Sequence, residues 1–142
     1  MGVLRTSPDD ETPKRLGQLH IDFVELLDEF KPVVVSVERI FFQNNIRTAV
    51  GVAQASGLAL ALASNRDIQV VQYSPSEVKS VVAGDGQADK VQVQEMVQVL
   101  LGLAELPKPA DAADAAALAL CHLAYDPGLR SATLDGATAG VH

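Results

Sequence analysis

A nearly continuous run of β-branched residues lies between two helical patterns and most constrains the fold of this 142-residue chain. Val33-Val34-Val35-Ser36-Val37 is typical of a strand that is buried on both faces. The segment before it, residues 12–30, repeats large apolar residues at three- and four-residue intervals. That spacing predicts an amphipathic helix with Thr12 as its N-cap and Pro13 in the first position. The order of helix, buried strand and helix predicts an α/β sheet flanked by helices.

The next helical segment, residues 46–64, carries no charge between Thr48 and Ser64. A helix that is apolar nearly all round must be covered on two sides. We expect the sheet to cover one side, and another helix or a second subunit to cover the other. Downstream, the pattern predicts a strand at residues 69–73 and helices at about 75–82, 90–101 and 111–124, the second of these capped by Asp89.

The composition limits the classes of function. The chain has 11 Lys plus Arg against 18 Asp plus Glu, a formal charge of −7, so contact with a nucleic acid has to come from a local patch. Acidic and basic residues are nearly balanced only between residues 39 and 90. The single cysteine, Cys121, excludes an intramolecular disulfide and indicates a reducing compartment, the cytoplasm. No apolar run is long enough for a membrane-spanning helix, so no membrane association is expected.

Glu38 follows the buried strand directly, so it lies at the carboxyl end of that strand. In open α/β sheets this edge is where ligands bind. A carboxylate there needs a cationic partner, which can be a bound metal ion or a salt bridge to Arg39 or Arg47. Both interpretations of Glu38 remain open at this point.

Asp111 and Asp114 lie three residues apart in the first turn of the last helix, so their carboxylates share one face. Negative charge is favourable at a helix N-terminus, which makes capping a sufficient explanation. A divalent cation between the two carboxylates would relieve their repulsion equally well. Oxygen ligands without Cys or His suit Mg or Mn rather than zinc.

Five ordered blocks of sequence carry a resemblance to a known family. They are VERIFFQNN at 37–45, QASG at 54–57, SPSEVK at 74–79, GDGQADKVQV at 84–93 and PADAADA at 109–115. In order and spacing they resemble the RuvC family of crossover junction endodeoxyribonucleases, which resolve Holliday junctions.

The resemblance implies a ribonuclease H-like mixed sheet flanked by helices, and a homodimer that cuts four-way junction DNA in recombination and repair. It implies hydrolysis by two Mg ions, with Mn as a possible substitute, and branch-migration motor proteins as partners. Glu38, Asp111 and Asp114 match family residues that are both catalytic and metal-binding. Lys79 and Lys90 match lysines near the DNA backbone, and Phe41 matches an aromatic residue that stacks on a base.

The chain departs from the family pattern at its beginning. The family opens with a strand bearing Asp-Pro-Gly, whose aspartate is the central metal ligand, whereas this chain begins at what resembles the third strand, residues 2–6. We therefore expect an N-terminally incomplete fold with its first strands missing. The Asp126-Pro127-Gly128 stretch is an ordinary turn sequence, and it follows the helix end remote from Asp111. It is therefore not expected to replace the missing motif.

These features predict a ribonuclease H-like junction resolvase domain at residues 1–124 and a flexible tail at residues 125–142. The leading function is a structure-selective endonuclease. One alternative is a catalytically incomplete junction-binding module or fragment, because the first-strand aspartate is absent. A third class, a subunit-interface protein without a DNA role, rests on the uncharged stretch of helix from Thr48 to Ser64.

Overall fold

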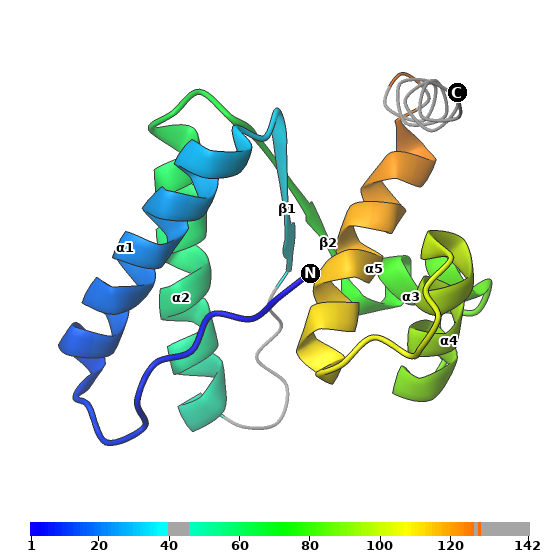
Figure 1. Cartoon of the computed structure of the whole chain (residues 1–142), viewed down its shortest axis with the longest axis horizontal. Helices are drawn as coiled ribbons and strands as arrows, with labels where there is room; N and C mark the ends of the chain where they lie inside the picture. The colour runs from blue at the N-terminus through cyan, green and yellow to red at the C-terminus, as the bar shows by residue number, and fades with distance from the viewer. Residues whose placement is uncertain (40–45, 127, 129–142) are drawn as a thin grey trace. The chain divides into compact units, whose positions relative to one another are not determined.

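The computed structural model describes residues 1–39, 46–126 and 128, and these residues form five helices and two strands (Figure 1). Phe41 falls outside the described residues. In chain order the elements are α1 (Thr12–Phe30), β1 (Val34–Glu38), α2 (Ile46–Ser64), β2 (Gln69–Tyr73), α3 (Pro75–Ala83), α4 (Lys90–Leu101) and α5 (Ala110–Tyr125). The chain divides into two compact units, which we call the N-terminal unit (residues 2–74) and the C-terminal unit (residues 75–142 with Met1).

The sheet of the N-terminal unit consists of β1 and β2, which pair in parallel from Val34 opposite Gln69 to Glu38 opposite Tyr73. The two strands and the helices around them confirm the expected α/β class. The strand begins and ends one residue later than predicted, so Glu38 is the last residue of β1 and not the residue after it. Because the strands are parallel, both carboxyl ends lie at one edge of the sheet.

Helix α2 packs against α1 and contacts both strands, and Figure 1 shows α1 and α2 side by side. Another helix therefore covers one side of the uncharged segment, as one of the two alternatives predicted. Near the end of α2, Leu62 and Ala63 are buried, whereas Val50 and Val52 near its start are about half exposed. The apolar surface of α2 is thus only partly covered within the described residues.

Three local predictions were wrong. The N-cap of α1 is Glu11 and not Thr12, and no side chain caps this helix end. The residues of β1 are half-buried or exposed, because a two-stranded sheet leaves its side chains partly open to water. The expected strand at residues 2–6 is not formed, because a strand requires a hydrogen-bonded neighbour and no described segment pairs with these residues.

The C-terminal unit is a cluster of three helices in which α3, α4 and α5 contact one another. Val97 of α4 and Cys121 of α5 are fully buried at its centre. Small residues of α5 allow the close packing, since Ala113 and Ala117 are also fully buried. Asp89 caps α4 as predicted: its side chain accepts a hydrogen bond from the backbone N–H of Gln92 at 2.9 Å.

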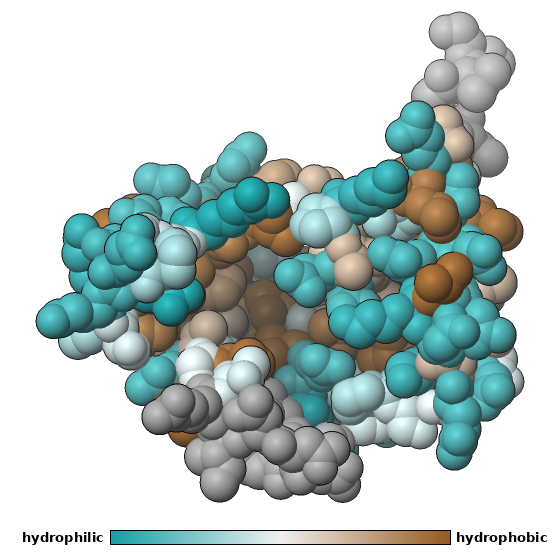
Figure 2. Space-filling model, turned by 90° about the horizontal axis from the view of Figure 1, so that it is seen from below, coloured by the Kyte–Doolittle hydropathy of each residue, from teal (hydrophilic) through white to brown (hydrophobic). Residues whose placement is uncertain are grey.

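Large apolar side chains also reach the surface of this unit, among them Val99 and Leu100 of α4. Figure 2 shows hydrophobic residues at the surface of the C-terminal unit, on the right of the view, among hydrophilic ones. Over the described residues, none of the helices combines the length and the apolar character needed to cross a membrane.

The predicted boundary between domain and tail lies at the end of α5, which continues to Tyr125. Asp126 is the C-cap of this helix, and its carboxylate accepts a hydrogen bond from the backbone N–H of Gly128 at 2.9 Å. This contact is the local turn that the sequence predicts. Residues 127 and 129–142 of the expected tail lie outside the described residues, so the tail stays a prediction.

Candidate active site

Glu38 is placed by the pairing of the two strands. It is exposed at the carboxyl end of β1, opposite Tyr73. The chain stays beside β2 for one further residue, because the backbone N–H of Arg39 donates to the carbonyl of Tyr73 at 2.8 Å. The guanidinium of Arg39 donates to the carbonyl of Gln72 at 3.3 Å. Backbone hydrogen bonding therefore fixes where the Glu38 carboxylate emerges.

Asp111 and Asp114 lie in the first turns of α5, with two buried alanines between them. Ala112 is 2% exposed and Ala113 is fully buried, so the small residues anchor the helix while Asp111 is exposed and Asp114 half exposed. The N-cap is Pro109, which has no side-chain acceptor, so neither aspartate is the N-cap residue. Their charges still favour this end of the helix through its dipole.

Lys90 is the first residue of α4 and lies beside Asp114. Its Nζ atom is 3.9 Å from Oδ2 of Asp114, and the two side chains are 72% and 48% exposed. The structure thus brings together one candidate DNA-binding residue and one candidate metal ligand. Both belong to the C-terminal unit.

Lys79 lies on α3 and is partly exposed. Its neighbour Val78 and, one turn on, Val82 are buried, so they hold the helix in the unit. The loop before α4 approaches this helix closely: a Cβ atom at Gly86 would lie 2.9 Å from Oγ of Ser76. The absence of a side chain at Gly86 therefore lets the loop that leads to Lys90 pack against the first turn of α3.

The three candidate metal ligands come from both units, Glu38 from the N-terminal and Asp111 and Asp114 from the C-terminal. Taken by itself, neither unit contains among its described residues a group of three or more His, Cys, Asp or Glu that could hold a metal ion. The convergence of the three carboxylates stays a prediction. Two carboxylates on one helix face do fit a Mg ion, which commonly binds through one or two carboxylates together with waters and substrate phosphates.

Cys121 is not suited to act as a nucleophile. Burial, with a smaller contribution from the Glu77 carboxylate, raises the pKa of its thiol above the ordinary value, so the thiol stays protonated near neutral pH. His122, its neighbour, is also buried, at 9% exposure. The raised pKa and the burial of Cys121 thus agree with the expected hydrolysis without a covalent intermediate, which stays a prediction.

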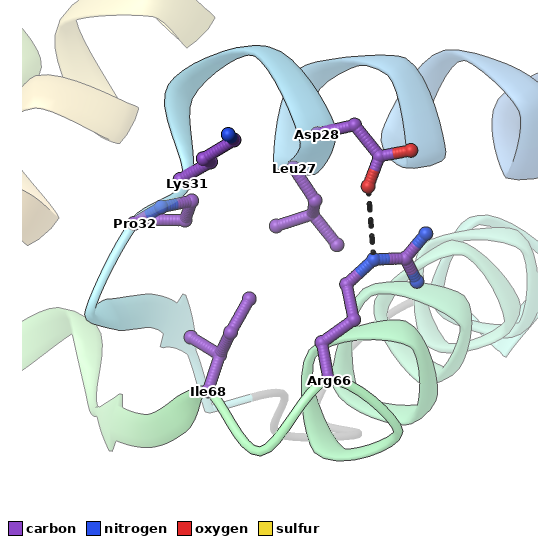
Figure 3. A pocket seen from close by; sticks show the side chains of 6 residues that line it. All are labelled: Leu27, Asp28, Lys31, Pro32, Arg66 and Ile68. Atoms are coloured by element: carbon purple, nitrogen blue, oxygen red, sulfur yellow. Dashed lines mark hydrogen bonds and ion pairs between the residues drawn. The ribbon is translucent and has the colours of Figure 1, made fainter.

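The N-terminal unit contains a pocket of about 410 Å³ that the sequence does not predict (Figure 3). Figure 3 shows Leu27 and Ile68 facing into it, and Nε of Arg66 bonded to Oδ1 of Asp28 at 3.3 Å. Pro32 and Ile68, which line it, precede β1 and β2, so the pocket lies at the opposite end of the strands from Glu38. No local sequence pattern predicts the contact between Asp28 and Arg66, which are 38 positions apart in the chain.

The family model described as "Crossover junction endodeoxyribonuclease RuvC" matches residues 1–122. The protein of that name from Salinispora arenicola is 53% identical over 129 residues, which cover 91% of this chain and 73% of the relative. The one from Frankia alni is 52% identical over 128 residues, covering 90% of this chain and 65% of the relative. The chain thus spans about two thirds to three quarters of the length of these two relatives.

Solved structures agree with the sequence matches. The structure of Thermus thermophilus RuvC superposes with a TM-score of 0.79 at 40% identity, covering 87% of this chain and 75% of that chain. Thermus thermophilus RuvC in complex with a Holliday junction substrate gives the same TM-score and identity over 85% of this chain and 73% of that chain. The predicted ribonuclease H-like α/β class is confirmed, and the chain belongs to the RuvC family of crossover junction endodeoxyribonucleases.

Proposed function

We propose that this chain is a Holliday junction resolvase, a nuclease that hydrolyses phosphodiester bonds of four-way DNA junctions in recombination and repair. Its membership of the RuvC family supports this proposal, together with the junction complex solved for the Thermus thermophilus protein. The observation that carries it is the pairing of carboxylate and lysine on neighbouring helices, Asp114 beside Lys90. A hydrolase of charged phosphodiesters needs both oxygen ligands for metal ions and cations for phosphate.

Glu38, Asp111 and Asp114 are the proposed ligands of two Mg ions, with Mn as a possible substitute. When bound, such a pair of ions supplies a nucleophilic water and stabilises the leaving oxygen. The residues of the chain hold the carboxylates in place: the β1–β2 ladder fixes Glu38, and the buried alanines of α5 fix the two aspartates.

Lys79 and Lys90 are the proposed contacts to the DNA backbone. Each neutralises a phosphate, a contact that depends on salt and carries no sequence information directly. Phe41 is the proposed stacking residue for a base at the opened crossover, where stacking contributes about 1–3 kcal/mol. The partial exposure of Lys79 and the 72% exposure of the Lys90 side chain support the first of these roles.

The proposal extends to the setting of the protein. The half-exposed Val50 and Val52, which lie in the uncharged part of α2 after Arg47, favour a homodimer in which a second copy would cover them. The unpaired, buried Cys121 favours the reducing cytoplasm. Branch-migration motor proteins are partners that the family resemblance implies. Residues 1–124 would form the resolvase domain, and the match of the family model to residues 1–122 supports that boundary.

Two assays on the same preparation test the function. A gel shift with a synthetic four-way junction in Ca measures binding, and incubation of the same junction in Mg measures cleavage. A resolvase gives both a shift and symmetrically nicked product, while linear duplex of the same sequence is not cut. A gel shift without cleavage product would favour the junction-binding module. The absence of both a shift and a product would overturn a DNA role for the chain.

A further inference from the structure

The ion pair between Lys90 and Asp114 joins a residue proposed to bind DNA to a residue proposed to bind metal. Neither residue is placed by the pair itself. Lys90 follows Asp89, whose carboxylate accepts from the N–H of Gln92 while the Gln92 side chain accepts from the N–H of Asp89, both at 2.9 Å. Asp114 follows the fully buried Ala113. The positions of Lys90 and Asp114 are thus set by the packing and capping of their helices, and not by the ion pair between them.

We propose that Lys90 is a displaceable counter-ion for Asp114. In the metal-free protein its ammonium neutralises the carboxylate, and it gives up Oδ2 of Asp114 when a divalent cation binds there. The released ammonium is then available to a DNA phosphate. This inference rests on the proposed metal site and assigns Lys90 a role in metal binding as well as in DNA binding.

The geometry suits a contact that is made and broken. At 3.9 Å the pair is a long one, and both side chains are largely open to water. Exposed ion pairs of this kind shift an equilibrium by only about one- to fivefold, so a divalent cation displaces the lysine at little cost. The flexible four-carbon stem of lysine lets the ammonium move while the backbone of α4 stays fixed.

The charges around the pair explain why a cation is favourable beside Asp114. Asp111 lies on the same face of α5 as Asp114, and two carboxylates so placed repel each other when no cation is bound. Asp89 is engaged at the N-terminus of α4 through Gln92, so its carboxylate already has a donor. Of these three acidic residues, Asp114 is the one that forms a described ion pair with the ammonium of Lys90.

The test measures binding of Mn²⁺ to the 142-residue chain by isothermal titration calorimetry and by the loss of the free-ion electron paramagnetic resonance signal. Lys90→Ala is expected to bind Mn²⁺ about two- to fivefold more tightly than the parent chain, because the competing ammonium is gone. Lys14→Ala is the matched control. Lys14 forms an exposed ion pair with Asp10 in the other unit, so this change alters the net charge equally and should leave Mn²⁺ affinity unchanged.

Asp114→Asn separates failure of this inference from failure of the metal site. The inference requires that Asp114→Asn weakens Mn²⁺ binding and that Lys90→Ala has no further effect in that background. If Asp114→Asn weakens binding but Lys90→Ala leaves it unchanged or weakens it, the counter-ion role is wrong and the metal site stands. If Asp114→Asn has no effect on Mn²⁺ binding, both are wrong. An equal gain in Lys14→Ala would show a net-charge effect only, and would overturn the counter-ion role.

Discussion

Glu38 and Tyr73 face each other as the last pair of the parallel β1–β2 ladder. The pairing places the carboxylate at the edge where both strands end, and the Arg39–Tyr73 hydrogen bond of 2.8 Å extends the ladder one residue further. The pairing of the two strands holds the backbone at Glu38 and does not depend on the charge of its side chain. Glu38 can therefore be changed to an isosteric amide to ask about its chemistry alone.

We expect Glu38→Gln to reduce junction cleavage in Mg by about 100-fold or more, since even the outer-shell partners of metal ligands account for about 10–100-fold. Junction binding in Ca should stay within about twofold, because the variant removes a ligand charge and no phosphate contact. Glu29→Gln, at an exposed position of α1, is the control with the same chemical change and should cleave like the parent. Loss of binding in Glu38→Gln would indicate a structural role.

Lys79→Ala should weaken junction binding in a salt-dependent manner. A lysine that neutralises one phosphate contributes about one unit to the slope of log K against log salt, so the variant should lower that slope by about 1. Lys14→Ala, which removes the same charge on α1, should leave the slope unchanged. The measurement is a gel-shift series between low and moderate salt. An unaltered slope for Lys79→Ala would contradict its role at the backbone.

Two valines of α4 should differ in how much they contribute to the stability of the C-terminal unit. Val97 is fully buried, so Val97→Ala should lower the free energy of unfolding by about 2 kcal/mol through lost burial and the cavity left behind. Val99 is 70% exposed, and Val99→Ala should change it by less than about 0.5 kcal/mol. Urea denaturation followed by circular dichroism compares the two. Equal effects would mean that the helix packs through a different face.

Removal of the capping box of α4 should lower the free energy of unfolding by less than Val97→Ala does. Asp89→Ala removes the acceptor for the N–H of Gln92 and should cost about 1 kcal/mol. Glu105→Ala removes the same charge at an exposed loop position and should be close to neutral. Thermal melts of both variants at one pH provide the comparison, and a neutral Asp89→Ala would show that water replaces the cap.

The raised pKa of Cys121 gives a pH dependence with a definite sign. The folded protein holds the thiol proton more tightly than the unfolded chain, so the stability that this thiol provides is fully present below the unfolded pKa and is lost as the pH rises above it. Cys121→Ala should be less stable than the parent at neutral pH, because a buried group is lost. The difference should shrink in the alkaline range above about pH 8.5, the ordinary pKa of a thiol. A difference that stays constant with pH would contradict this prediction.

Local patterns in the sequence were enough to place most of the elements. The β-branched run located β1 to within one residue, and Asp89 located the start of α4, because each depends on residues close together in the chain. The predicted N-cap of α1, Thr12, is wrong because the helix begins one residue earlier than a side-chain cap would place it. Glu11 is the N-cap residue, and it makes no side-chain hydrogen bond to the helix end. Helix ends that lack a side-chain cap are the hardest to place from sequence.

Contacts between distant segments could not be predicted in this way. The Lys90–Asp114 pair joins α4 to α5, and the Arg66–Asp28 pair joins the turn after α2 to α1, so only packing decides which charges meet. Glu38 was found as a candidate because its position at a strand end is a local property. Its convergence with Asp111 and Asp114, which belong to the other unit, stays a prediction.

The reciprocal hydrogen bonds between Asp89 and Gln92 hold the first turn of α4. Neither bond of this capping box involves the side chain of Lys90. The charge beside Asp114 can therefore be changed at position 90 without removing the hydrogen bonds that begin α4.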